Sequence, residues 1–177
     1  SAPLAKLLLG EIAPVALAGL LYLGSGIGVL LIKLVQGLNT TTSEAQITRP
    51  DWKWLLGAVV AGGIAAPIIL LFSLRQTPAS TASLLLNFEG VATTAIAVLV
   101  FREAVSKKAL WAVICVAIAS ILLTWDTSGQ WGISLGALGV MGACVLWGID
   151  NNFTRMISAK DPLTIVLVKG LGAGSFS

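Results

Sequence analysis

The sequence predicts an all-α fold, a polytopic bundle of helices that crosses a membrane. Its 177 residues are 56% hydrophobic and 11% charged, and their mean hydropathy is +0.94. The apolar residues come in long blocks rather than at the spacing of a soluble amphipathic helix. Several blocks approach the roughly 20 residues that a helix needs to cross the hydrocarbon core of a bilayer. These observations exclude a soluble domain.

The composition also excludes several classes of function. The chain has no His, which removes most zinc sites and catalytic triads, so we expect no metal and no cofactor. Cys115 and Cys144 both lie deep inside apolar runs, which is typical of packing residues rather than of a disulfide. The net charge is +3, but no basic patch suggests nucleic acid as a partner.

The spans can be followed along the first part of the chain. Residues Ser1–Leu9 resemble the tail of a helix, and Ile12–Val35 is expected to cross the membrane. Residues Gln36–Asp51 form a polar loop that contains Pro50. The next span is Leu55–Leu74, where Gly57, Ala61 and Ala65 repeat at the spacing of closely packed helices, and Pro67 is expected to kink it.

Two further apolar runs, residues 79–101 and 109–125, flank a turn at 102–108 that carries three positive charges. Glu89 lies in the middle of the first run. An ionised carboxylate near the bilayer centre costs several kcal/mol, so it must face protein or water. Glu89 is therefore a candidate functional residue.

A short loop at 126–131 leads to a span at Gly132–Met156, and a last apolar run starts at Leu163 and stops at Ser177. We expect both ends of the sequence to interrupt a helix. The basic residues predict the orientation, because cytoplasmic loops are rich in Lys and Arg. With alternating spans, one side receives only Lys6 and Arg75. The other side, which we expect to be cytoplasmic, receives Lys33, Arg49, Lys53, Arg102, Lys107, Lys108, Arg155 and Lys160.

The beginning of the chain recurs at its end. At an offset of 148 positions, Pro14 matches Pro162, and Gly24-Ser25-Gly26 matches Gly172-Ala173-Gly174. An odd number of spans separates the two copies, so the second is upside-down relative to the first. Inverted repeats of this kind are typical of secondary transporters.

The segment SLLLNFEGVATTAIAVLVFREAVSKKALWAVICVAIASILL resembles the EamA domain of the drug/metabolite transporter superfamily. The family pattern is a Leu-rich run, Leu/Phe-Glu-Pro, an apolar half-helix, a (Gly/Arg)-Glu turn and a helix of small residues. Phe88-Glu89 and Arg102-Glu103 stand at the corresponding positions. The departure is Gly90, where Pro is commoner, and it leaves open whether the helix bends there.

The resemblance implies a protein of ten helices in two inverted halves, with its substrate bound between them. Residues 1–125 then correspond to the first half with an incomplete first helix, 126–131 to a short non-cytoplasmic loop, and 132–177 to the truncated start of the second half. It also implies a multi-pass transporter in the cytoplasmic membrane of a prokaryotic cell. Its partners would be the lipid bilayer, a small metabolite or drug-like solute and, as open alternatives, protons or a second copy of the chain.

Helical geometry sorts the polar residues of the Glu89 run into two faces. Asn87 lies on one stripe with several hydroxyl residues, whereas Glu89 and Thr93 lie on nearly the opposite side. We expect this helix to be surrounded by protein, with one face lining a cavity. Glu89 would bind substrate or a proton; alternatively, it would hold a fixed bond between helices.

In the span 132–156, one stripe carries small residues in one half and Trp147, Asp150 and Thr154 in the other. This stripe resembles the wall of a substrate pathway, or else a groove for helix packing. Lys169 lies at about the same depth as Asp150, so the two are expected to pair, while Asn151 points elsewhere around the helix. The candidate substrate- or proton-binding residues are thus Asn87, Glu89, Trp147, Asp150, Asn151, Thr154 and Lys169.

Two other functions remain as alternatives to transport. A non-transporting structural membrane subunit should not carry acids at mid-depth in two helices. An intramembrane enzyme would need a constellation of reactive groups at one depth, and the scattered acids without His disfavour it.

Overall fold

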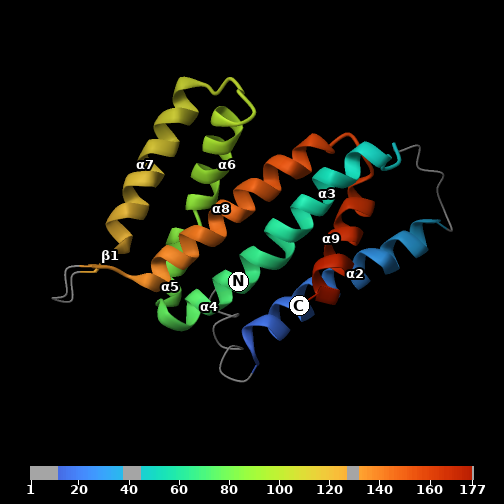
Figure 1. The fold of residues 1–177 in the computed structure, drawn as a ribbon, viewed down its shortest axis with the longest axis horizontal. Coiled ribbons are helices and arrows are strands. Elements are labelled where there is room, and N and C mark those ends of the chain that lie inside the picture. The colour runs from blue at the N-terminus through green and yellow to red at the C-terminus, as the bar shows by residue number, and fades with distance from the viewer. Residues whose placement is uncertain (1–11, 38–44, 127–131, 177) are drawn as a thin grey trace.

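The fold is described by a computed structural model that covers residues 12–37, 45–126 and 132–176. It is a bundle of helices, as the sequence predicts (Figure 1). In chain order the elements are α2 (Pro14–Gly37), η1 (Arg49–Asp51), α3 (Trp52–Ala58), η2 (Val59–Ala65), α4 (Ala66–Gln76), α5 (Ala79–Leu85), α6 (Phe88–Leu99), α7 (Lys107–Thr124), β1 (Trp125–Asp126), β2 (Gly132–Ile133), α8 (Leu135–Met156) and α9 (Pro162–Phe176). The helix tail expected at Ser1–Leu9 and most of the loop at 126–131 lie outside the described residues.

Within the described part of the chain, three helical stretches are long and apolar enough to cross a membrane. They are Pro14–Val35, Arg49–Gln76 and Ala79–Leu99. The shorter apolar helix Pro162–Phe176 coincides with the last expected run. The predicted membrane bundle is therefore confirmed.

The second of these stretches contains an irregular turn. The elements α3, η2 and α4 follow one another without a loop. The middle one, η2, is a π-helical segment, in which backbone hydrogen bonds join residues five apart. At its end the Ala66 N–H donates to the Ala61 carbonyl. In this register the next nitrogen belongs to Pro67, which has no N–H to give. The irregularity expected at Pro67 is thus a π-helical turn just before it.

The run at 79–101 is not one helix. A turn at Leu86 and Asn87 separates α5 from α6, where the N–H groups of Asn87 and Glu89 bond to carbonyls three residues back. The side-chain amide of Asn87 also donates to the Leu84 carbonyl at 2.9 Å, which favours this local turn over a continuous helix. The break falls before Glu89, so Glu89 lies in the first turn of α6, where the helix dipole favours a negative charge.

Helix α8 lies at the centre of the bundle, against α4 and η2 on one side and α6 on the other (Figure 1). Its small residues permit this close approach. A Cβ at Gly139 would lie 2.0 Å from the Ser73 hydroxyl, and one at Gly148 would lie 2.9 Å from the Thr93 nitrogen. The small half of the 132–156 stripe is therefore a groove for helix packing.

Helices α2 and α9 cross at glycines that the internal repeat relates to each other. A Cβ on Gly26 would lie 2.7 Å from the Leu171 nitrogen, and a Cβ on Gly174 would lie 2.6 Å from the Leu23 nitrogen. The offset of 148 positions exchanges these two contacts, because it takes 26 to 174 and 23 to 171. Both helices also begin at the matched prolines, Pro14 and Pro162. Such an exchange of contacts is the signature of a two-fold relation between α2 and α9.

The end of α2, the start of α3, the α6–α7 turn and the α8–α9 turn lie at one end of the bundle (Figure 1). We call it the basic end. It carries the basic residues expected in the cytoplasm: Lys33, Arg49, Lys53, Arg102, Lys107, Lys108, Arg155 and Lys160.

Candidate functional site

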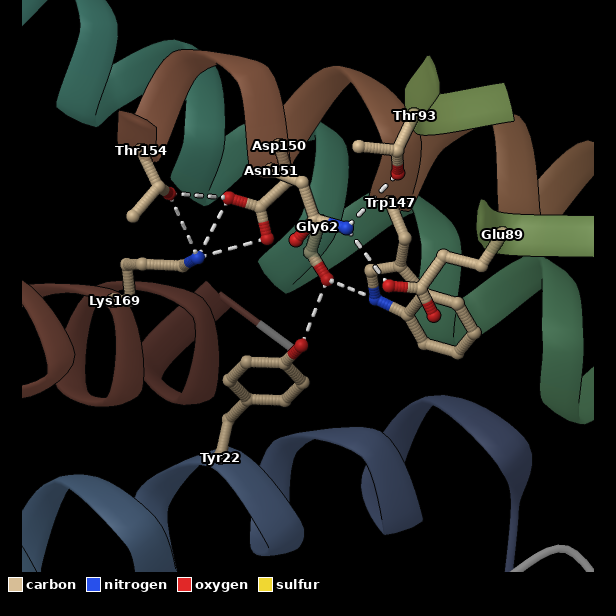
Figure 2. Close-up of polar contacts among 9 residues, drawn as sticks. All are labelled: Tyr22, Gly62, Glu89, Thr93, Trp147, Asp150, Asn151, Thr154 and Lys169. Carbon is tan, nitrogen blue, oxygen red and sulfur yellow. Dashed lines mark hydrogen bonds and ion pairs between the residues drawn. The ribbon is translucent and has the colours of Figure 1, made fainter. Parts of the chain in front are cut away.

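The site is organised around the carbonyl of Gly62, which lies in the π-helical turn. Tyr22 Oη donates to this oxygen at 2.7 Å, and Trp147 Nε1 donates to it at 3.1 Å. Figure 2 shows the two side chains reaching the carbonyl from α2 and from α8. Because Pro67 has no N–H in the register of the turn, the Gly62 oxygen is available to donors outside its own helix. The π-helical turn η2 is thus bonded to both α2 and α8 through the Gly62 carbonyl.

Gly62 also lets α8 approach the turn closely. A Cβ at this position would lie 2.0 Å from Asp150 Oδ2. Any larger residue would therefore displace the Asp150 carboxylate.

Asp150 forms the expected ion pair with Lys169. Lys169 Nζ lies 2.6 Å from Asp150 Oδ1 and 2.8 Å from Asp150 Oδ2, and Thr154 Oγ1 lies 3.0 Å from Asp150 Oδ1. Asp150 is 5% exposed, so its charge would be costly without this partner. The pair joins α8 to α9, and it neutralises both charges.

Glu89 lies on the other side of α8 and is partly exposed. Asn151 Nδ2 donates to Glu89 Oε1 at 2.8 Å and to Thr93 Oγ1 at 3.1 Å. Asn152 Nδ2 donates to the Thr93 carbonyl at 3.0 Å. The two asparagines therefore hold α6 against α8, and Figure 2 shows the contacts of Asn151. Among the described residues, Glu89 has no cationic partner.

The structure brings most of the candidate residues together. We call the 9 residues drawn in Figure 2 the polar cluster, and it includes Glu89, Trp147, Asp150, Asn151, Thr154 and Lys169. Asn87 is not part of it, because it is exposed in the turn between α5 and α6, and its amide donates to the Leu84 carbonyl of α5. Of the two polar faces of the 79–101 run, it is the Glu89 face that packs against α8.

Sequence reasoning missed two members of the cluster, Tyr22 and Gly62. The sequence contains a feature that could have identified each of them. Tyr22 is the single tyrosine of the chain and sits in an otherwise apolar span, where its hydroxyl requires a partner. Gly62 stands five residues before Pro67, the spacing that leaves a carbonyl without a donor in a π-helical register.

The two acids of the cluster differ in their partners. Among the described residues, no group of three or more His, Cys, Asp or Glu side chains could hold a metal ion. Asp150 is occupied by Lys169, whereas Glu89 has a neutral amide donor and access to its surroundings. Glu89 is thus the acid of the cluster that has no cationic partner among the described residues.

Comparisons with known proteins point to a family of transporters. A family model, the EamA-like transporter family, matches residues 1–125. An "uncharacterized transporter" of Methanothermobacter thermautotrophicus (strain Delta H) is 27% identical over 190 residues, which cover 99% of this chain. The chain spans 55% of the length of that relative. No solved structure matches the chain.

Proposed function

The chain belongs to the EamA-like transporter family, and on this basis we propose that the protein carrying it is a secondary transporter of a small metabolite or drug-like solute. The transport would proceed by alternating access, in which two halves rock around a site near the bilayer midplane. We further propose that it is a multi-pass protein of the cytoplasmic membrane in a prokaryotic cell.

One observation supports this proposal most directly, the polar cluster around the Gly62 carbonyl. Its side chains come from α2 and α6, before residue 125, and from α8 and α9, after residue 132. A site between two halves requires contributions from both sides of that boundary. Irregular backbone at membrane depth is tolerated where protein or a cavity surrounds it, and it often marks a binding site.

We assign different roles to the two acids. Asp150 would be a fixed part of the site, since Lys169 and Thr154 occupy its oxygens. Glu89 would carry the exchangeable proton or contact the solute, because Asn151, its side-chain partner among the described residues, is neutral. Coupling of transport to protons is therefore proposed for Glu89 rather than for Asp150.

The test is Glu89→Gln in the full-length transporter, reconstituted in proteoliposomes and assayed with a panel of solutes across a pH gradient. The variant keeps the shape of the side chain but cannot titrate. We expect it to insert and fold, and to lose the pH dependence of uptake. Ser83→Ala is the matched control, because its exposed hydroxyl bonds to the Ala79 carbonyl and lies outside the cluster.

An unchanged pH profile in Glu89→Gln would assign Glu89 a structural role and remove the proton coupling. The absence of flux for every solute in the unmodified protein would instead support the alternative of a structural membrane subunit.

A further inference from the structure

We infer that three ion pairs at the basic end form a clamp that closes the proposed transport pathway on that side of the membrane. This inference rests on the proposed transporter function. The pairs are Lys33–Asp161, Asp51–Lys160 and Glu103–Arg155.

Each pair joins a residue of the first predicted half to a residue of the second. Lys33 Nζ lies 2.5 Å from Asp161 Oδ2, and Lys160 Nζ lies 3.2 Å from Asp51 Oδ2. Arg155 pairs with Glu103 of the α6–α7 turn. The Glu103 side chain is 28% exposed. Three separate segments of the first half, the α2 end, η1 and the α6–α7 turn, are thus tied to the two ends of one short turn.

Backbone and hydroxyl contacts reinforce the same turn. The Asp161 N–H donates to the Ala45 carbonyl at 3.1 Å, and Ala45 and Lys160 form a parallel β-bridge. Lys33 Nζ also bonds to Thr164, whose hydroxyl bonds in turn to Asp161. The α8–α9 turn is therefore held by side chains and by main chain.

The ion pair between Asp150 and Lys169 differs from the three pairs of the clamp. Asp150 and Lys169 both lie after residue 132, so a movement between halves leaves their pair intact. Among the described residues, no ion pair joins the two halves at the opposite end, where Gly136 packs against Gln76 instead. Within the part of the chain that the structure describes, charge pairing between halves is thus confined to one end, as a closure on one side of the membrane requires.

A cavity of about 410 Å³ lies next to the clamp. It is lined by residues of both halves: Lys33, Gln46, Ile47, Trp52, Asp161, Thr164 and Val168. Val168 follows Thr164 by one helical turn of α9, so it lies deeper along the helix axis than the charged pair. Separation of Lys33 from Asp161 would open this cavity further toward the basic end and expose Val168.

The three ion pairs of the clamp are weak enough for the closure to be reversible. The side chains of Lys33 and Asp161 are 32% and 19% exposed, so they retain part of their hydration. An ion pair of this kind changes an equilibrium by about two- to fivefold. Three of them hold one end closed without making the closed state permanent.

The experiment measures the access of water to the cavity rather than transport, so its failure differs from failure of the proposed function. In the full-length protein with Cys115 and Cys144 replaced by Ala, Val168→Cys is labelled with a membrane-impermeant thiol reagent from the basic side. Asp161→Lys, which opposes Lys33, should raise the labelling rate about two- to fivefold. The exchange Lys33→Asp with Asp161→Lys should return it toward the original rate.

Two controls make the outcome decisive. Lys53→Asp reverses a charge at the same end outside the clamp, since Lys53 Nζ lies 4.9 Å from the Trp54 ring centroid, and it should leave labelling unchanged. Ser158→Cys is exposed in the α8–α9 turn and should label equally in all variants. The clamp is refuted if Asp161→Lys labels at the original rate. It is equally refuted if the exchanged pair labels as fast as Asp161→Lys, or if Asp161→Asn, which removes the attraction without adding repulsion, leaves the rate unchanged.

Discussion

At the scale of single residues, the ion pair of Asp150 and Lys169 is the most demanding feature of the cluster. Asp150→Asn would leave the half-buried Lys169 ammonium without a counter-charge, and removing one partner of a buried pair costs about 3–5 kcal/mol. We expect this loss in the free energy of unfolding, measured by denaturation in detergent micelles. The double variant Asp150→Asn with Lys169→Met should recover most of it. If the single and double variants are equally unstable, the pair does not stabilise the fold.

Asp161 predicts a specific dependence of stability on pH. Burial alone would raise the pKa of its carboxyl, but hydrogen bonds from Lys33, from Thr164 and from the Leu163 N–H hold that pKa well below its usual value of 3.8. A depressed pKa in the folded state stabilises the protein above the unfolded pKa, and this contribution is lost as the pH falls toward the folded pKa. The stability difference between the unmodified protein and Asp161→Asn should therefore be constant from about pH 8 to pH 5, and shrink below about pH 4. Thermal unfolding at each pH measures it, and a difference that already falls between pH 7 and pH 5 would contradict the assignment.

At the scale of the elements, the crossing of α2 and α9 depends on glycines that contact backbone. Gly26→Ala would bring a methyl group within 2.7 Å of the Leu171 nitrogen, and overpacking of this kind costs about 1–3 kcal/mol. Gly28→Ala is the matched control two positions along the same helix, since nothing lies within 4 Å of its Cβ and Ala is the better helix former. Denaturation of both variants measures the difference. Equal stability of the two would mean that α2 and α9 do not cross as described.

At the scale of the whole molecule, the basic end should face the cytoplasm because cytoplasmic loops are rich in Lys and Arg. In intact cells, with Cys115 and Cys144 replaced by Ala, an impermeant thiol reagent should not label Ser158→Cys in the α8–α9 turn. It should label Ser80→Cys, which is exposed at the start of α5 near the opposite end. The reverse pattern would invert the orientation, and the clamp would then close the outer side.

The ion pair of the polar cluster could be predicted because its two residues lie close together in the sequence. Asp150 and Lys169 are separated by one turn between two helices, so counting their depth from that turn was enough to match them. The position of Tyr22 could not be predicted in this way. Its partner, Gly62, is 40 residues away, and the choice of partner depends on how α2 lies against η2.

The sequence by itself determined the membrane bundle, the main spans and the gathering of basic residues at one end. These features follow from the hydropathy, helical rise and charge of each segment, which do not depend on how the segment packs against its neighbours. The tertiary structure decided the break at Leu86 and Asn87, the face of α6 that meets α8, the donors to the Gly62 carbonyl and the pairing of charges between halves. Each of these depends on which groups a neighbouring helix places within bonding distance, because a polar group buried in a membrane protein must find its partner wherever the packing provides one.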